Sequence, residues 1–168
     1  NFFLKNEFYA DVLSDIDALG DKYGKSDFGN GKKINVEFVS ANPTGPMHMG
    51  NARGGALGDC LAAVLEWAGY EVAREFYVND AGNQIDKFGL SLDVRYQQLL
   101  LGEDAIELPE DSYHGEDIKV RAQEFIDVYG DKYLKETEEV RRKALVEFAL
   151  PKNIETMKGA MEKYRIDY

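Results

Sequence analysis

The chain has 168 residues, enough for one domain, and its hydrophobic fraction of 44% supports a packed core and excludes a disordered chain. A net charge of −11 without a long basic tract excludes a large nucleic-acid surface, because phosphate neutralisation dominates such binding. The single cysteine excludes a disulfide framework, and no apolar run approaches the roughly 20 residues needed to span a bilayer.

The first elements alternate between helical and strand patterns. Apolar residues at helical spacing predict an amphipathic helix from residue 6 to about 23, and a polar glycine-rich loop follows over 24–33. The β-branched and aromatic run from Ile34 to Val39 predicts a buried strand. The chain's densest glycine and proline segment, SANPTGPMHMGNARGG (40–55), comes directly after it.

A second helix is predicted from His48 to Ala68, with Gly69 as its C-terminal stop. Its apolar positions fall on one helical face: Leu57, Leu61, Val64, Leu65 and Ala68. Cys60 lies in the same run, where we expect a buried structural thiol in a reducing compartment.

The run from Glu71 to Val78 predicts a second strand, so the spacing is that of a βαβ unit with two parallel strands and a right-handed connection. Beyond it we expect a helix over 81–101, an acidic loop from 102 to 117, and charged helical sequence interrupted near Pro151. The fold class is therefore α/β. Two strands make too small a sheet to stand alone, so further strands must come from other sequence.

The segment between the first strand and the second helix has the position of a ligand loop. Ligands of open α/β sheets bind beyond the carboxyl ends of the strands, where a helix N-terminus attracts anions. The segment has no lysine, which excludes a Walker A loop, and the pattern that remains is His48-x-Gly50-Asn51. Imidazole and amide groups can both donate to phosphate oxygens. A capped strand-to-helix turn without a ligand is the alternative.

Longer stretches around this pattern resemble a known family. VEFVSANPTGPMHMGNARGGALGD (36–59) and REFYVNDAGNQI (74–85) resemble signature segments of arginyl-tRNA synthetases, which are class I aminoacyl-tRNA synthetases; PEDSYHGEDI and GDKYL resemble pieces of the bacterial-type insertion. The resemblance implies a partial Rossmann-like nucleotide-binding fold with a helical insertion. It divides the chain into a helix and linker from an amino-terminal domain (1–30), the first half of the catalytic domain (31–101) and a helical insertion or connective region (102–168).

The resemblance also implies roles for residues of the motif. His48 and Asn51 would be catalytic, although asparagine stands where the family's motif usually has a second histidine. The ATP-binding residues would be Pro43, Thr44, Gly45, His48, Gly50 and Asn51. The arginine-binding residues would be Glu37, Ser40 and Asn42. Glu37 would pair with the guanidinium; the alternative is a solvent-facing glutamate on an edge strand.

Four further residues are candidates for lining the site: Arg53, Asn79, Asp80 and Gln84. For Arg53, the alternative to a phosphate contact is an ion pair with Asp59. For Asp80, the alternative is a helix cap.

The implied reaction joins L-arginine to ATP as an adenylate and then passes the arginyl group to tRNA(Arg). Mg²⁺ would travel with ATP, without a protein-held metal. The family's lysine-rich KMSK-type loop and its helical anticodon-binding domain are absent from these residues, so we expect a fragment, inactive alone, that meets tRNA mainly through domains outside this chain. We expect a cytoplasmic protein with no membrane contact, monomeric at full length. The alternatives are another HxGH-type nucleotidyltransferase and a non-catalytic arginine- or nucleotide-binding module.

Overall fold

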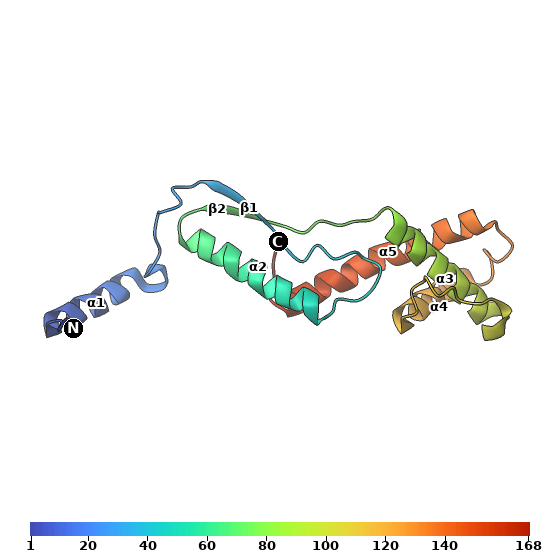
Figure 1. The fold of residues 1–168 in the computed structure, drawn as a ribbon, viewed down its shortest axis with the longest axis horizontal. Helices are drawn as coiled ribbons and strands as arrows, with labels where there is room; N and C mark the ends of the chain where they lie inside the picture. Colours follow the sequence, from blue (N-terminus) through green and yellow to red (C-terminus); the bar gives the residue numbers. More distant parts are fainter.

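A computed structural model describes all of residues 1–168, and its ribbon is elongated, with three parts in chain order (Figure 1). At one end project α1 (Asn6–Leu19) and the 3₁₀ turn η1 (Gly20–Lys22). The middle holds β1 (Lys33–Glu37), α2 (Met49–Trp67) and β2 (Glu71–Glu75). The other end is a helical unit of α3 (Asn83–Leu101), η2 (Glu103–Ala105), α4 (Glu116–Tyr129) and α5 (Glu138–Lys163).

The predicted βαβ unit is confirmed. β1 and β2 pair in parallel, from Lys33 beside Glu71 to Glu37 beside Glu75. The prediction of a buried first strand is wrong, since Val36 is the only buried residue of β1. With two strands and one covering helix, every second side chain of β1 faces away from the core.

α2 packs on the sheet through its small residues. Gly58 lies so close to Phe38 that a Cβ there would be 2.2 Å from the phenylalanine ring, and Gly55 and Ala62 are buried beside it. The predicted helix end is confirmed, because Gly69 adopts a φ of +86° and the Tyr70 N–H donates to the Leu65 carbonyl at 3.1 Å.

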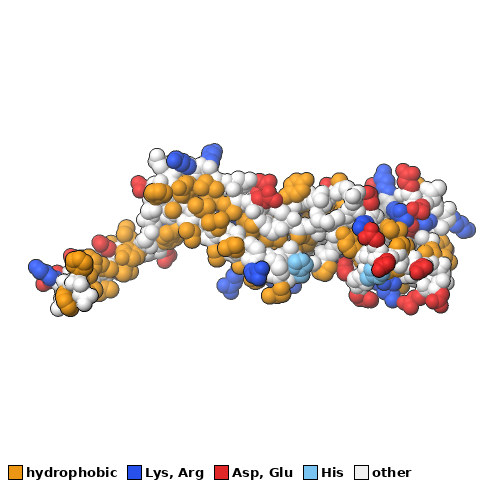
Figure 2. All heavy atoms as spheres, viewed as in Figure 1, with side chains coloured by type: hydrophobic (Ala, Val, Ile, Leu, Met, Phe, Trp, Pro, Cys, Tyr) orange, Lys and Arg blue, Asp and Glu red, His pale blue; other side chains and the backbone are white.

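Most of the large apolar residues of α2 face outward instead, whereas Leu65 packs on the core of the βαβ unit. Leu57 is 73% exposed and Val64 is 65% exposed. Cys60 is also exposed, so the expectation of a buried thiol is wrong. The cause is the close packing of the glycine face, which turns the bulky face away from the sheet. α1 likewise has no buried residue, and Figure 2 shows hydrophobic side chains gathered over both regions.

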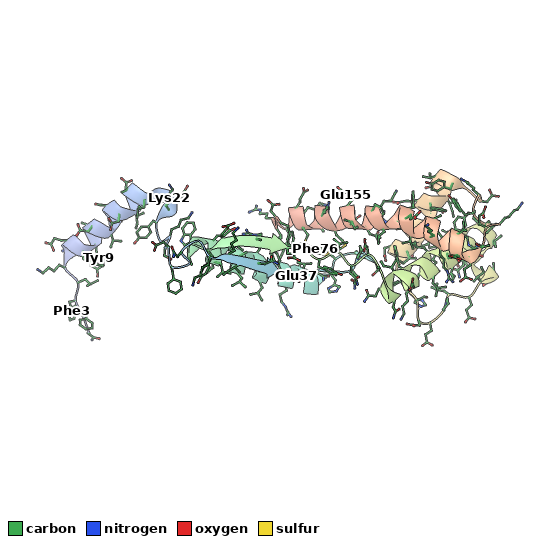
Figure 3. The ribbon with its side chains drawn as sticks, turned by 90° about the horizontal axis from the view of Figure 1, so that it is seen from above. Phe3, Tyr9, Lys22, Glu37, Phe76 and Glu155 are labelled. Carbon is green, nitrogen blue, oxygen red and sulfur yellow. The ribbon has the colours of Figure 1, made fainter.

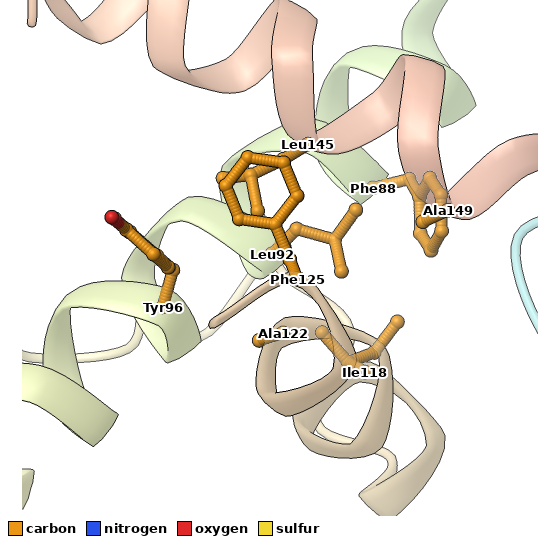
Figure 4. Packing of buried hydrophobic residues seen from close by; sticks show 8 residues of the cluster. All are labelled: Phe88, Leu92, Tyr96, Ile118, Ala122, Phe125, Leu145 and Ala149. Atoms are coloured by element: carbon orange, nitrogen blue, oxygen red, sulfur yellow. The ribbon is translucent and has the colours of Figure 1, made fainter. Parts of the chain in front are cut away.

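The helical unit has its own core, in which α3 packs on α4 and α5 (Figure 4). Eight buried residues form it: Phe88, Leu92, Tyr96, Ile118, Ala122, Phe125, Leu145 and Ala149. Beside this core the buried Asp93 carboxylate accepts hydrogen bonds from Nε and Nη2 of Arg141. α3 thus makes most of its contacts with the two helices that follow it.

α5 continues through Pro151 for 26 residues, so the predicted interruption is wrong. Its first half contributes Leu145 and Ala149 to the helical core, and its second half contributes Met161 to the core of the βαβ unit. Packing at both ends outweighs the backbone hydrogen bond that proline removes. α5 therefore links the two cores.

Candidate active site

The chain makes a strained turn where β1 ends. Val39 has a φ of +67° and Ser40 a φ of +39°, and the Ser40 N–H donates to the Phe38 carbonyl at 3.0 Å, which closes a γ-turn. A β-branched residue rarely adopts positive φ, and such strain gathers at functional sites. Residues that follow the turn line a pocket together with His48 and Gln84.

Ser40 ties this turn to the ends of both strands. Its hydroxyl donates to Oε1 of Glu37 at 2.7 Å and accepts the N–H of Tyr77 at 3.1 Å. Glu37 itself is exposed, at the same end of the sheet as Phe76 (Figure 3). Its carboxylate is thus presented at the carboxyl edge of the strands and is not buried within the sheet.

A stacked aromatic pair supports the end of β1 from behind. The Tyr168 ring stacks on Phe38 with centroids 4.6 Å apart, and its hydroxyl donates to the Phe38 carbonyl at 2.9 Å. Burial, together with the nearby Asp59 carboxylate, raises the pKa of the Tyr168 phenol to about 12. Tyr168 therefore stays a neutral donor throughout the physiological pH range.

His48 and Asn51 cap the N-terminus of α2 reciprocally. The His48 N–H donates to Oδ1 of Asn51 at 3.0 Å, and the Gly50 N–H donates to Nδ1 of His48 at 3.1 Å. A Cβ on Gly50 would lie 2.9 Å from the imidazole, so glycine leaves room for the ring. The capped turn that was the alternative interpretation of this pattern is therefore present.

The cap leaves the donors of both side chains free. Because Nδ1 of His48 accepts a hydrogen bond, the neutral ring carries its proton on Nε2. Asn51 accepts with Oδ1, so both N–H groups of its amide remain available. The helix N-terminus adds partial positive charge at the same place. This arrangement suits a phosphate or another anion.

These residues face an open pocket of about 610 Å³. Among the predicted site residues, its lining includes Ser40, Asn42, Thr44, Gly45, His48, Asn51 and Gln84. Asn42 donates its amide to Oε1 of Gln84, which joins residues 40–55, here called the motif segment, to α3. Pro43 is buried behind the segment.

Other predicted residues lie outside the pocket lining. Glu37 is at the strand end, and Asn79 and Asp80 belong to the connection before α3. Gly82 is the N-cap of α3 without a side-chain bond, so Asp80 does not cap that helix. Arg53 is exposed, and Asp59 pairs with Arg74 at 3.5 Å, so the alternative Arg53–Asp59 pair is wrong.

The loop before α4 supplies pocket residues that sequence reasoning missed. Tyr113 and Gly115 of this loop, and Asp117 in the first turn of α4, line the pocket together with residues of the motif segment. The Tyr113 N–H donates to the buried Ser91 hydroxyl at 2.8 Å, which fixes the loop on α3. The only sequence signal for this loop was the stretch PEDSYHGEDI. It resembles part of the family's insertion, but it does not indicate that the loop lines the pocket.

A smaller cavity of about 360 Å³ lies between the connection after β2 and the end of α5. Phe76 and Val78 line one side and Met157 and Met161 the other. Eight of its 12 lining residues are hydrophobic, so it does not suit a phosphate.

Comparisons with known proteins agree with this geometry. The family model "tRNA synthetases class I (R), catalytic domain" matches residues 13–155. The chain is 61% identical over 166 residues to an arginine–tRNA ligase of Acetivibrio thermocellus. The match covers 99% of this chain and 29% of that protein. It is also 61% identical to the arginine–tRNA ligase of Caldanaerobacter subterraneus subsp. tengcongensis, in a match that covers 100% of this chain and 30% of that protein.

Solved structures that resemble this chain are also described as arginyl-tRNA synthetases. A Campylobacter jejuni protein described as "putative arginyl t-RNA synthetase" matches with a TM-score of 0.83 and 33% identity, over 98% of this chain and 35% of the other. Thermus thermophilus arginyl-tRNA synthetase shares the fold, with a TM-score of 0.56 and 22% identity, over 100% of this chain and 26% of that one. The chain thus spans about 30% of the length of its curated relatives. It belongs to the family of class I tRNA synthetases (R), as part of their catalytic domain.

Proposed function

We propose that this chain is part of an arginine–tRNA ligase and contributes the ATP-phosphate and arginine sites of its first step. The reciprocal cap carries this proposal, because it leaves Nε2 of His48 and the Asn51 amide free to donate at a helix N-terminus. A carboxylate oxygen of arginine bonds to the α-phosphorus of ATP, and the bond to the β-phosphate oxygen breaks, releasing pyrophosphate. The arginyl group then passes to the terminal ribose of tRNA(Arg).

In this proposal the chain's residues position the reactants and stabilise developing charge. His48 and Asn51 donate to phosphate oxygens, where charge grows during displacement. Thr44 and Gly45 line the same pocket and would lie against the nucleotide. Mg²⁺ would accompany the ATP phosphates and neutralise their charge. No group of three His, Cys, Asp or Glu side chains is arranged to hold a metal.

Glu37 and Ser40 would recognise arginine at the strand ends. A carboxylate accepts two parallel hydrogen bonds from a planar guanidinium, which a lysine ammonium cannot reproduce. The bond from Ser40 fixes the Glu37 carboxylate in place. Asn42, held by Gln84, would face the substrate's polar backbone groups.

The test is ATP–pyrophosphate exchange by the full-length protein with tRNA present, using arginine, lysine, glutamine and glutamate in parallel. We expect exchange with arginine alone. Exchange with none of the four would contradict the proposal and favour a nucleotidyltransferase of the HxGH type or a non-catalytic binding module.

Replacing Glu37 with glutamine is expected to raise KM for arginine roughly 10- to 100-fold, since a charge-assisted hydrogen bond contributes about 1.5–3 kcal/mol. KM for ATP should stay unchanged. The matched control is Glu71→Gln, because Glu71 lies at the opposite end of the sheet beside Lys33, at 3.4 Å. Equal effects of the two substitutions on KM for arginine would refute the role of Glu37.

We also propose that tRNA(Arg) is met mainly through regions outside these residues, in line with the net charge of −11. None of the helices combines the length and apolar character needed to cross a membrane. The free Cys60 is consistent with a reducing compartment, and we propose a cytoplasmic, monomeric protein.

A further inference from the structure

A buried asparagine in α5 holds the backbone of the motif segment. Asn153 is 7% exposed, and its Nδ2 donates to the carbonyl of Pro43 at 2.9 Å. The two residues are 110 positions apart in the chain. This is the one side-chain hydrogen bond that joins α5 to the segment between Phe38 and His48.

The direction of the Asn153 amide is fixed by its second partner. Nε of Arg121 donates to Oδ1 of Asn153 at 2.8 Å. Arginine has no acceptor, so the amide oxygen must face it and the amide N–H must face Pro43. Arg121 is itself held by Glu124, at 3.1 Å, and by the Thr156 hydroxyl, at 2.9 Å.

The bond fixes a peptide group at the start of the pocket lining. The Pro43 carbonyl belongs to the peptide that leads into Thr44, which is 8% exposed and lines the pocket with Gly45. Without Asn153 this buried carbonyl would have no partner from α5, and a buried unpaired acceptor is costly. Rotation of that peptide would move Thr44 and Gly45 away from their positions in the pocket lining.

We propose that Asn153 is a positioning residue for adenylate formation: it holds the Pro43–Thr44 peptide in the orientation that presents Thr44, Gly45 and the His48 cap to the pocket. This inference rests on the proposed function. It also gives α5 of the helical unit a part in the first step of the reaction.

The diagnostic substitution is Asn153→Asp in the full-length protein. Aspartate keeps the acceptor for Arg121 but replaces the donor to Pro43 with an oxygen that repels the carbonyl. We expect kcat for pyrophosphate exchange to fall roughly 10- to 100-fold, the range that small misplacements produce. KM for arginine should stay within about twofold, because Glu37 and Ser40 are held by β1 and Tyr77. Asn153→Ala, which adds no charge, should lower kcat similarly.

Gln98→Glu is a closely matched control. Gln98 is 8% exposed, donates from Nε2 to the Ile106 carbonyl at 2.7 Å and accepts from Nη1 of Arg95 at 2.9 Å. It thus repeats the arrangement of an amide between an arginine and a backbone carbonyl, but away from the motif segment. We expect Gln98→Glu to keep the wild-type kcat. Equal losses of kcat in the Asn153 and Gln98 variants, or wild-type kcat in Asn153→Asp, would overturn the inference.

Hydrogen exchange separates this inference from the proposed function. In Asn153→Asp, amides of residues 44–51 should exchange faster than in the wild type, while those of α3 stay protected. Absence of exchange activity in the wild type with every amino acid would defeat the proposed function. Unchanged amide exchange in residues 44–51 would defeat the positioning role, whatever the enzyme's activity.

Discussion

Replacing His48 with alanine in the full-length protein is expected to lower arginine-dependent pyrophosphate exchange roughly 100- to 1,000-fold, the usual effect of removing one donor to a developing charge. The substitution removes the Nε2 donor and also leaves the Gly50 N–H without its acceptor. The measurement is kcat at saturating arginine and ATP, with tRNA present.

Two control variants separate chemistry from helix capping. Asparagine is a good N-cap, so His48→Asn keeps an acceptor for the start of α2 but loses the imidazole. We expect it to be nearly as slow as His48→Ala, and recovery of the wild-type rate would mean that His48 acts only as a cap. His114→Ala changes the chain's other histidine, whose Nε2 lies 3.2 Å from the Pro109 carbonyl in the loop before α4. It should leave kcat unchanged.

Replacing Asp93 with alanine is expected to destabilise the helical unit by about 3–5 kcal/mol, because it leaves a buried charge without its partner. The side chain of Asp93 is 2% exposed and that of Arg141 is 9% exposed. In the native protein, hydrogen bonding to Asp93 raises the pKa of the Arg141 guanidinium. Without Asp93 the guanidinium still stays charged, because arginine is not deprotonated in proteins, so it cannot relieve the loss by giving up its proton. Hydrogen exchange of the α3 and α5 amides in the full-length protein measures this local stability.

Glu147→Ala is the control on the same helix, since Glu147 and Lys143 are both exposed and lie 3.9 Å apart. It should change the stability by no more than about 0.5 kcal/mol. The double substitution Asp93→Leu with Arg141→Met should recover part of the loss, because both charges leave together. Arg142, 3.5 Å from Asp93, limits that recovery. An Asp93→Ala protein as stable as Glu147→Ala would contradict a structural role for the pair.

The local parts of the fold were predictable because their signals lie close together in the sequence. Strand, helix and strand followed from side-chain periodicity, and the stop at Gly69 followed from residue type. Periodicity says which residues share a helical face, but not which face packs inward. In α2 the small residues Gly58 and Ala62 allow close approach to the sheet, so the larger stripe containing Leu57 and Cys60 faces outward. To identify which face of α2 packs inward, one must also know the surface of the sheet against which it packs.

The candidate site likewise has a local part that the sequence predicts and a long-range part that it does not. His48 and Asn51 are three residues apart, so their reciprocal cap follows from local spacing at a helix start. The contact of Asn153 with Pro43 and the approach of Tyr113 to the motif segment depend on how the helical unit folds back. No local pattern specifies such long-range contacts, which is why the motif was predictable and its support was not.

The path of α5 through both cores has a mechanical consequence. A helix whose two ends pack in different cores passes a displacement of one core on to the other. Pro151 has no N–H, so one backbone hydrogen bond of α5 is missing and the helix bends more easily at that point. That point lies two residues before Asn153, between the anchoring residues Ala149 and Met161. We therefore expect a displacement of the helical unit to bend α5 close to Asn153, which donates to the Pro43 carbonyl in the motif segment.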